Sequence, residues 1–218
     1  MDIWNTWLEA IRMLLGALTS GLGLELGLAV IVATILLRIA LLPISWSAAY
    51  RGCVRQKRMQ ALQPEIDALK SKLGHDREVY ARELIALHKS RKIALVDGKA
   101  ILGSLAQLPL FAGMFHVLKN IGEGSRFLWM PSLARPDVLL AVIAGFTTAL
   151  MVAANPDMPE QLRLVMLIVP AVVAVFSAMH FSSALALYWT TSNLFSAGQT
   201  LVLHSIVNRR LRSGKLVA

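Results

Sequence analysis

The sequence predicts an all-α membrane protein with five transmembrane helices, and three observations support this. Of the 218 residues, 56% are hydrophobic and only 16% are charged, whereas an ordinary soluble domain has roughly a quarter charged residues. The mean hydropathy is +0.60. Five apolar segments are long enough, or nearly so, to cross a hydrocarbon layer of roughly 30 Å. These segments are residues 26–46, 101–118, 138–154, 163–180 and 184–207.

The N-terminal residues 1–24 are expected to form an amphipathic helix that lies in the membrane interface. Trp4, Trp7, Leu8 and Ile11 recur at the spacing of one helical face. The apolar stretch is short for a span, and tryptophan favours the interface. The segment also lacks the basic region of a cleavable signal peptide. We therefore place this helix on the extracytoplasmic surface.

Residues 51–92, between the first two spans, predict a cytoplasmic antiparallel hairpin of coiled-coil type. Apolar residues recur with alternating three- and four-residue steps, which is a heptad pattern. Gly74 interrupts the pattern. A disordered charged loop is the alternative, but such loops do not keep heptads. The residues that form the pattern are Met59, Leu62, Ile66, Leu69 and Leu73 before the interruption, and Tyr80, Leu84 and Leu87 after it.

Lysine and arginine are distributed unevenly among the segments outside the spans. Residues 47–99 contain twelve of them and the basic tail 208–218 contains four, whereas residues 1–25 contain one and residues 119–137 contain three. The positive-inside rule then places the N-terminus outside and the C-terminus inside, which five crossings satisfy. These blocks account for the formal net charge of +9 and suit anionic lipid headgroups. Sequence-specific binding of nucleic acid is not predicted.

Arg38 lies inside the first apolar segment, and no predicted span contains an aspartate or glutamate. A guanidinium near the middle of a bilayer costs roughly 2.5–3.5 kcal/mol on insertion scales. Arginine cannot reduce this cost by losing its proton. We therefore expect a hydrated, polar pocket around Arg38. The alternative is that the side chain snorkels to the inner interface.

Other polar residues within the spans are candidates for the same pocket. Thr34 lies one helical turn before Arg38 and shares its face. The last span carries a polar stripe whose members are three or four residues apart. For the serines and Asn193, hydrogen bonding between packed spans is the alternative. The candidate groove residues are Arg38, Thr34, Gln107, Tyr188, Trp189, Ser192, Asn193, Ser196 and Gln199.

The sequence shows no recognisable catalytic or metal-binding pattern. The single cysteine, Cys53, excludes a disulfide framework and a cysteine-based metal site within one chain. Phosphate-binding glycine loops and the HExxH motif are absent from the sequence. The sequence therefore predicts a protein that makes and breaks no bonds and needs no cofactor.

Several short motifs follow one another along residues 24–207. They are Thr34 with Arg38 and Leu41-Leu42-Pro43, residues 59–66 (MQALQPEI), Gln107-Leu108-Pro109, Phe127-Leu128-Trp129-Met130-Pro131, and Leu187-Tyr188-Trp189 with Ser192 to Ser196 and Gln199. In this order the motifs resemble the YidC–Oxa–Alb family of membrane protein insertases, in a short bacterial form. The resemblance implies a five-helix core with a hydrophilic groove open to the cytoplasm and the lipid.

The resemblance also implies a function. It implies an insertase and chaperone of the bacterial inner membrane that inserts and helps fold nascent membrane proteins through a groove centred on Arg38. Nascent membrane proteins, the Sec translocon and the ribosome are the implied partners. A small-anion channel or transporter is one alternative, which anion flux into empty liposomes would reveal. A non-catalytic assembly factor is another, and it would crosslink to one stable partner only.

Overall fold

The structure is a computed structural model that describes residues 2–91, 107–119, 121–156, 158 and 160–213. The described chain is helical, and its one β feature is an isolated bridge between Phe127 and Met130. The predicted all-α class is therefore confirmed for this part of the chain. The elements are α1 (Ile3–Gly16), the π-helical turn η1 (Ala17–Gly21), α2 (Leu26–Ala40), α3 (Leu42–Leu73), α4 (Arg77–Ser90), α6 (Gln107–Leu118), α7 (Val138–Ala153), α8 (Glu160–Ala178) and α9 (Ser183–Arg212).

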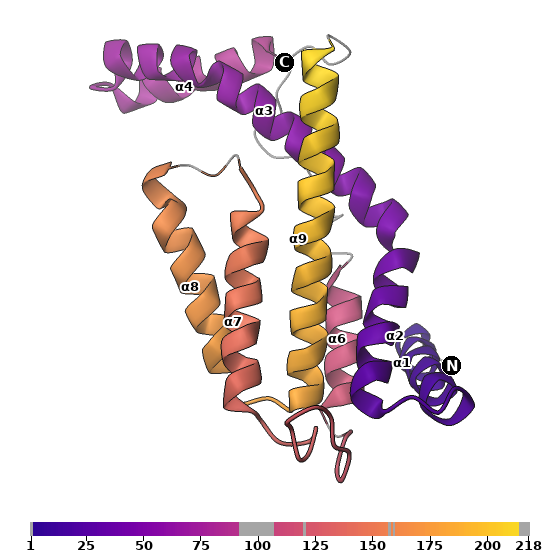
Figure 1. Ribbon diagram of the computed structural model, residues 1–218. Coiled ribbons are helices and arrows are strands. Elements are labelled where there is room, and N and C mark those ends of the chain that lie inside the picture. The colour runs from indigo at the N-terminus through magenta and orange to yellow at the C-terminus, as the bar shows by residue number, and fades with distance from the viewer. Residues whose placement is uncertain (1, 92–106, 120, 157, 159, 214–218) are drawn as a thin grey trace.

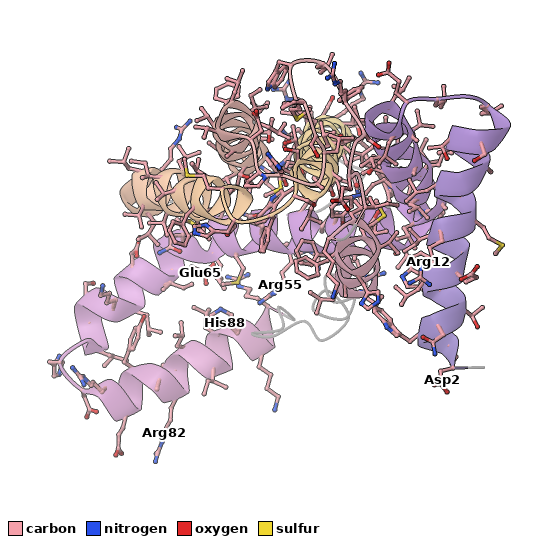
Figure 2. All side chains as sticks on the ribbon, turned by 90° about the horizontal axis from the view of Figure 1, so that it is seen from below. Asp2, Arg12, Arg55, Glu65, Arg82 and His88 are labelled. Atoms are coloured by element: carbon pink, nitrogen blue, oxygen red, sulfur yellow. The ribbon has the colours of Figure 1, made fainter. Side chains whose placement is uncertain are left out.

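The helices form an upright bundle with distinct structures at its two ends (Figure 1). α2, α6, α7, α8 and α9 run along the bundle, and α9 stands at its centre. The α3–α4 hairpin lies at one end, and residues 121–137 form a loop at the other. Seen from below, where the bundle helices are viewed end-on, α1 and the hairpin lie across the bundle axis (Figure 2).

The first predicted span, residues 26–46, is not one straight helix. α2 ends at Ala40, α3 begins at Leu42, and the two axes are bent by 63°. Pro43 occupies the first turn of α3. Proline is tolerated there but disfavours continuation of a preceding helix, because it has no N–H and its ring clashes with the carbonyl four residues earlier. The predicted span 26–46 therefore corresponds to a bent pair of helices with its break next to Pro43.

Among the described residues, only the bent pair of α2 and α3 has the length and apolar composition to cross a membrane, and no helix qualifies alone. Shorter apolar helices occupy Leu108–Leu118, Val138–Ala153 and Leu162–Ala178. The start of the predicted segment 101–118 lies outside the described residues. α7, α8 and α9 coincide with the remaining predicted segments, and the largest difference is that α9 continues from 207 to Arg212.

α9 is the element around which the bundle packs, since it contacts α2, α3, α6, α7 and α8. Ala29, Val30 and Ala33 of α2 and Ala184 and Leu185 of α9 belong to one buried apolar cluster. Small side chains allow helix backbones to approach closely. The same rule applies between α7 and α8, where a Cβ added at the buried Gly145 would lie 2.3 Å from Val175 Cγ2 and 3.0 Å from the Ala171 carbonyl oxygen.

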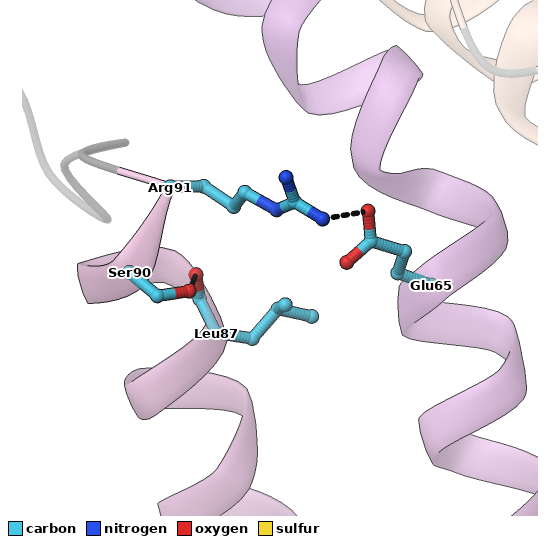
Figure 3. A network of polar contacts seen from close by, with 4 residues as sticks. All are labelled: Glu65, Leu87, Ser90 and Arg91. Atoms are coloured by element: carbon cyan, nitrogen blue, oxygen red, sulfur yellow. Dashed lines mark hydrogen bonds and ion pairs between the residues drawn. The ribbon is translucent and has the colours of Figure 1, made fainter.

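The segment 51–92 contributes to two helices, α3 and α4, that pack against each other. Asp76 caps α4, because its Oδ1 accepts hydrogen bonds from the backbone N–H groups of Glu78 and Val79 at 3.1 and 3.2 Å. At the far end of α4, Arg91 Nη2 reaches Glu65 Oε1 of α3 at 2.6 Å (Figure 3). The cap defines where α4 begins, and the exposed ion pair links the end of α4 to α3.

α1 is attached to the side of α6. Trp7 Nε1 donates a hydrogen bond to the Pro109 carbonyl oxygen at 3.0 Å. Trp7 and Ile11 lie so close to Gly113 that a Cβ added there would be 2.5 Å from the Trp7 Nε1. The buried face of α1, which includes Leu8 and Ile11, therefore faces protein, and the opposite face remains exposed.

We predict that Gly145→Ala destabilises the protein by about 1–3 kcal/mol, because the added methyl group overpacks the contact between α7 and α8. Gly198→Ala is the matched control: Gly198 lies inside α9 with no atom near its added Cβ, so it should be neutral or slightly stabilising. Thermal unfolding in detergent measures both. Equal melting temperatures for the two variants would contradict the close packing.

Candidate functional site

Arg38 lies in the last turn of α2 and is 9% exposed. It lines a cavity of about 350 Å³ between α2, α6 and α9. Arg38 is twelve residues into α2 and Ser192 nine residues into α9, which places them roughly 18 and 14 Å along their helices. The cavity therefore lies part of the way along the bundle, and it is open at one side, where Leu108 and Phe111 are exposed. Its lining residues are Arg38, Leu108, Phe111, Tyr188, Trp189, Ser192 and Asn193.

The guanidinium of Arg38 is held by one hydroxyl group. Its Nε donates a hydrogen bond to Ser192 Oγ at 2.9 Å, and its Nη2 also contacts that oxygen. Within the described part of the chain, no carboxylate forms an ion pair with Arg38. The contact with Ser192 orients the guanidinium but leaves its charge uncompensated, so the remaining N–H groups can serve an incoming anion.

One wall of the cavity is aromatic. The ring of Phe111 in α6 lies 6.2 Å from Tyr188 and 6.1 Å from Trp189, centroid to centroid, and the contact with Trp189 is edge-on. Tyr188 is only 3% exposed. Aromatic rings give a rigid apolar surface that also tolerates polar neighbours. The cavity thus combines a cation and hydroxyl groups with a face suited to apolar side chains.

Asn193 connects the cavity to α7. Its Nδ2 donates a hydrogen bond to Thr148 Oγ1 at 2.8 Å, and this hydroxyl in turn donates to the Ala144 carbonyl oxygen at 2.7 Å. Both side chains are buried. The contact is the interhelical hydrogen bond that the sequence left open as an alternative for Asn193. Asn193 also lines the cavity. It therefore fits both alternatives, as a hydrogen-bonding residue between α9 and α7 and as part of the cavity wall.

Other predicted site residues lie outside the cavity lining. Thr34 is fully buried, and its hydroxyl donates to the Val30 carbonyl oxygen of its own helix at 2.6 Å. Ser196 is half-buried further along α9. Gln199 Nε2 reaches Ser45 Oγ of α3 at 3.4 Å. Gln107 begins α6, and its side chain lies outside what the structure describes.

Sequence reasoning missed Leu108 and Phe111 as cavity residues. Both follow Gln107 on α6 and contribute to the lining. Nothing in an apolar span distinguishes a leucine or phenylalanine that faces a cavity from one that faces lipid. Their neighbour Pro109 and the nearby aromatic pair Tyr188-Trp189 are the only local signals.

The site has the properties of a binding pocket for a polar group in an apolar setting. A volume of about 350 Å³ holds roughly ten water molecules or a few side chains. In the described ranges, no group of three or more His, Cys, Asp or Glu side chains is placed to hold a metal ion. The chemistry available is electrostatic attraction and hydrogen bonding by Arg38, with Ser192 and Tyr188 beside it.

We predict that Ser192→Ala lowers the free energy of unfolding by about 1.5–3 kcal/mol, because it removes the hydrogen-bond acceptor of a buried charged group. Ser196→Ala, one helical turn further along α9, is the matched control and should change stability by much less. Thermal unfolding in detergent measures both variants. A melting temperature for Ser192→Ala equal to that of Ser196→Ala would show that Arg38 does not depend on this hydroxyl.

Comparisons with known proteins agree with the motifs in the sequence. The family model described as 60Kd inner membrane protein matches residues 17–210. The membrane protein insertase YidC of Oceanobacillus iheyensis is 28% identical over 219 residues, covering 93% of this chain and 84% of the relative. The insertase YidC 2 of Listeria monocytogenes is 29% identical over 188 residues, covering 81% and 67%.

Some relatives are much longer than this chain. The membrane protein insertase YidC of Ectopseudomonas mendocina is 31% identical over 197 residues, which are 88% of this chain but only 32% of the relative. This chain therefore corresponds to about a third of the longer relatives and to most of the shorter ones. Since the family model covers nearly all of the helical bundle, the chain belongs to the 60Kd inner membrane protein family, which is the YidC–Oxa–Alb family that its motifs resemble.

Proposed function

We propose that this protein is a membrane protein insertase and chaperone, and that its working element is the cavity around Arg38. The observation that carries the proposal is a buried guanidinium, held by Ser192 alone among the described residues, in a cavity of about 350 Å³. Keeping an unpaired cation at this depth is costly. The cost is explained if the charge binds part of a protein that is being inserted, which we call the passenger.

The proposed passenger is a nascent membrane protein with a short polar or acidic segment that must cross the membrane. Arg38 attracts the negative charge, and charge-assisted hydrogen bonds replace part of the lost hydration. Ser192, Asn193 and Tyr188 add hydrogen-bonding groups, while Phe111 and Trp189 receive apolar side chains. Ser196 and Gln199, further along α9, and Gln107, at the start of α6, extend the proposed passenger path beyond the cavity. Thr34 is fully buried and supports the packing of α2 beside Arg38 without facing the passenger.

The energy for insertion comes from the passenger itself. Its apolar segment leaves the protein for lipid, and burial of apolar surface yields about 25 cal/mol per Å². A groove that hydrates part of the membrane thickness only lowers the barrier to this transfer. We therefore propose a cycle without a nucleotide or another cofactor.

We propose that the hairpin end of the bundle faces the cytoplasm, with the N-terminus outside and the C-terminus inside. The basic residues Arg209, Arg210 and Arg212 end α9 on the side of the α3–α4 hairpin, as the positive-inside rule favours. At the opposite end, the loop 121–137 closes over the helices (Figure 1). The passenger would then enter from the hairpin side, where the Sec translocon, the ribosome and anionic lipids are candidate partners.

We predict that Arg38→Ala lowers the rate of insertion of a single-span substrate with an acidic tail by roughly tenfold or more, because charge-assisted hydrogen bonds contribute about 1.5–3 kcal/mol. Arg38→Lys should retain part of the rate if charge matters more than guanidinium geometry. Proteoliposome insertion assays with matched acidic and neutral tails measure both.

The control is Arg82→Ala, because Arg82 lies exposed on α4 and points away from the protein (Figure 2). Full activity of both Arg38 variants on both substrates would overturn the proposed role of the charge.

We also predict that a photo-crosslinking amino acid at position 189 or 192 forms adducts with many different nascent chains. The control position is 146, because Phe146 lies on α7 with 69% exposure and does not line the cavity. Position 146 should crosslink far less to nascent chains. Adducts with one stable partner only would favour a non-catalytic assembly factor, and anion flux through empty proteoliposomes would favour a channel.

A further inference from the structure

The loop 121–137 ends in an apolar tip that the proposed insertion cycle does not use. Phe127 N–H donates to the Met130 carbonyl oxygen at 3.1 Å, and Met130 N–H donates to that of Phe127 at 2.9 Å. These two bonds form a tight turn with Leu128 and Trp129 at its tip. Leu128 is 71% and Trp129 46% exposed, whereas Phe127 and Met130 are buried. We call Leu128 and Trp129 the loop tip.

Leu128 has an unfavourable backbone conformation for its residue type. Its φ of +50° is the only positive value at a non-glycine residue in the described chain. A side chain with a Cβ is strained in the left-handed region, which glycine and asparagine tolerate. Because Leu128 is also largely uncovered, its side chain adds little to the stability of the folded chain. The strained leucine therefore destabilises the folded chain without a compensating contact in the described protein. Backbone strain of this kind commonly marks functional positions.

The turn is held rigidly by the bundle. The Phe127 ring lies against α2 so closely that a Cβ added at Gly27 would be 2.2 Å from its Cγ. At the other side of the loop, the backbone N–H and Oγ of Ser183 both donate to the Arg135 carbonyl oxygen, at 3.0 and 2.6 Å. Leu128 is thus presented on a fixed support, and it does not fold back onto the protein.

The exposed surface of Trp129 is apolar, because the indole N–H forms a hydrogen bond within the loop. Its Nε1 donates a hydrogen bond to Asp137 Oδ1 at 3.0 Å. The same oxygen caps α7 by accepting from the Leu140 backbone N–H at 2.7 Å. The exposed part of the indole therefore extends the apolar surface of Leu128.

The loop that carries the tip is basic. Lys119, Arg126 and Arg135 are exposed in and next to the loop, against one exposed acid, Glu123. The loop lies at the end of the bundle opposite the hairpin (Figure 1), on a protein of an inner-membrane family. Leucine and tryptophan with basic neighbours suit the boundary between lipid headgroups and acyl chains.

We propose that the loop tip inserts into the lipid leaflet at this end of the bundle and acts as an interfacial anchor. The anchor fixes the height of α2, α7 and α9 relative to that leaflet, and through α2 it fixes the depth of Arg38. The anchor requires only that the bundle spans a membrane. It holds for either orientation and does not depend on the insertase function.

The test places an environment-sensitive fluorophore, NBD, at the tip. The native cysteine is removed as Cys53→Ala, and Leu128→Cys is labelled and reconstituted into vesicles of phosphatidylethanolamine and phosphatidylglycerol. Glu123→Cys is the matched control in the same loop. We expect lipids with a doxyl group on the acyl chain to quench the label at 128 several-fold more than the label at 123. We expect aqueous iodide to show the reverse order.

Each outcome decides the proposal. Equal iodide quenching at 128 and 123 would place the tip in water and overturn it. Protection of position 128 from both quenchers would mean that protein covers the tip, which also overturns it. Thermal unfolding of both labelled proteins verifies that they fold alike. The quenching pattern should persist in an Arg38→Ala background, so a failure of the anchor and a failure of the insertase role are distinguishable.

Discussion

The structure depends on the accommodation of one buried guanidinium. Arg38 comes from α2 and its acceptor Ser192 from α9, so the two helices must stay in register for the charge to be tolerated. The small residues of their interface permit this approach. A hydroxyl can orient the guanidinium but cannot neutralise it, so among the described residues the charge of Arg38 has no counter-ion.

The two ends of the bundle are built differently. At the loop end, Ser182 Oγ donates to the Leu118 carbonyl oxygen at 3.1 Å, and the Ala184 N–H donates to that of Leu133 at 3.0 Å. These contacts, together with those of Ser183, fix the loop to α6 and α9. At the hairpin end, side-chain pairs join α3 and α9: Arg210 Nη1 donates to Tyr50 Oη at 3.0 Å, and Cys53 Sγ lies 3.5 Å from His204 Nδ1. The two ends of the bundle are thus held by different kinds of contact.

Much of the helical bundle could be predicted from the sequence, because long apolar segments have few alternatives to a helix. The predictions for α7 and α8 differ from the structure only near their ends. α9 continues to Arg212, since hydropathy marks where a chain leaves the lipid and not where its hydrogen bonding stops. The sequence could not give the exact position of the break at Leu41, because Pro43 fits both a kinked span and the first turn of a new helix.

The candidate site was predictable only in part. Arg38, Ser192 and Asn193 attract attention because polar residues are rare in apolar spans, and they meet at one cavity. Ser196 and Gln199 share a helical face with Ser192, but each turn moves a side chain about 5.4 Å along the axis, and the cavity is short. Thr34 has the right face, yet its hydroxyl is satisfied by Val30 of its own helix. The spacing of polar residues in the sequence predicts which face of a helix they share. It does not predict the position along the helix axis at which a cavity opens.

The bend after α2 has an electrostatic consequence for Arg38. Because α2 stops at Ala40, Arg38 falls in the last turn of the helix, where the unpaired carbonyl groups carry the negative end of the helix macrodipole. Pro43 has no N–H to offer the Ile39 carbonyl, so the hydrogen-bond pattern of α2 does not continue through the break. A cation in such a position gains about 0.3–1 kcal/mol, and more where it is partly buried. The proline that shortens the helix therefore also lowers the cost of holding the Arg38 charge in apolar surroundings.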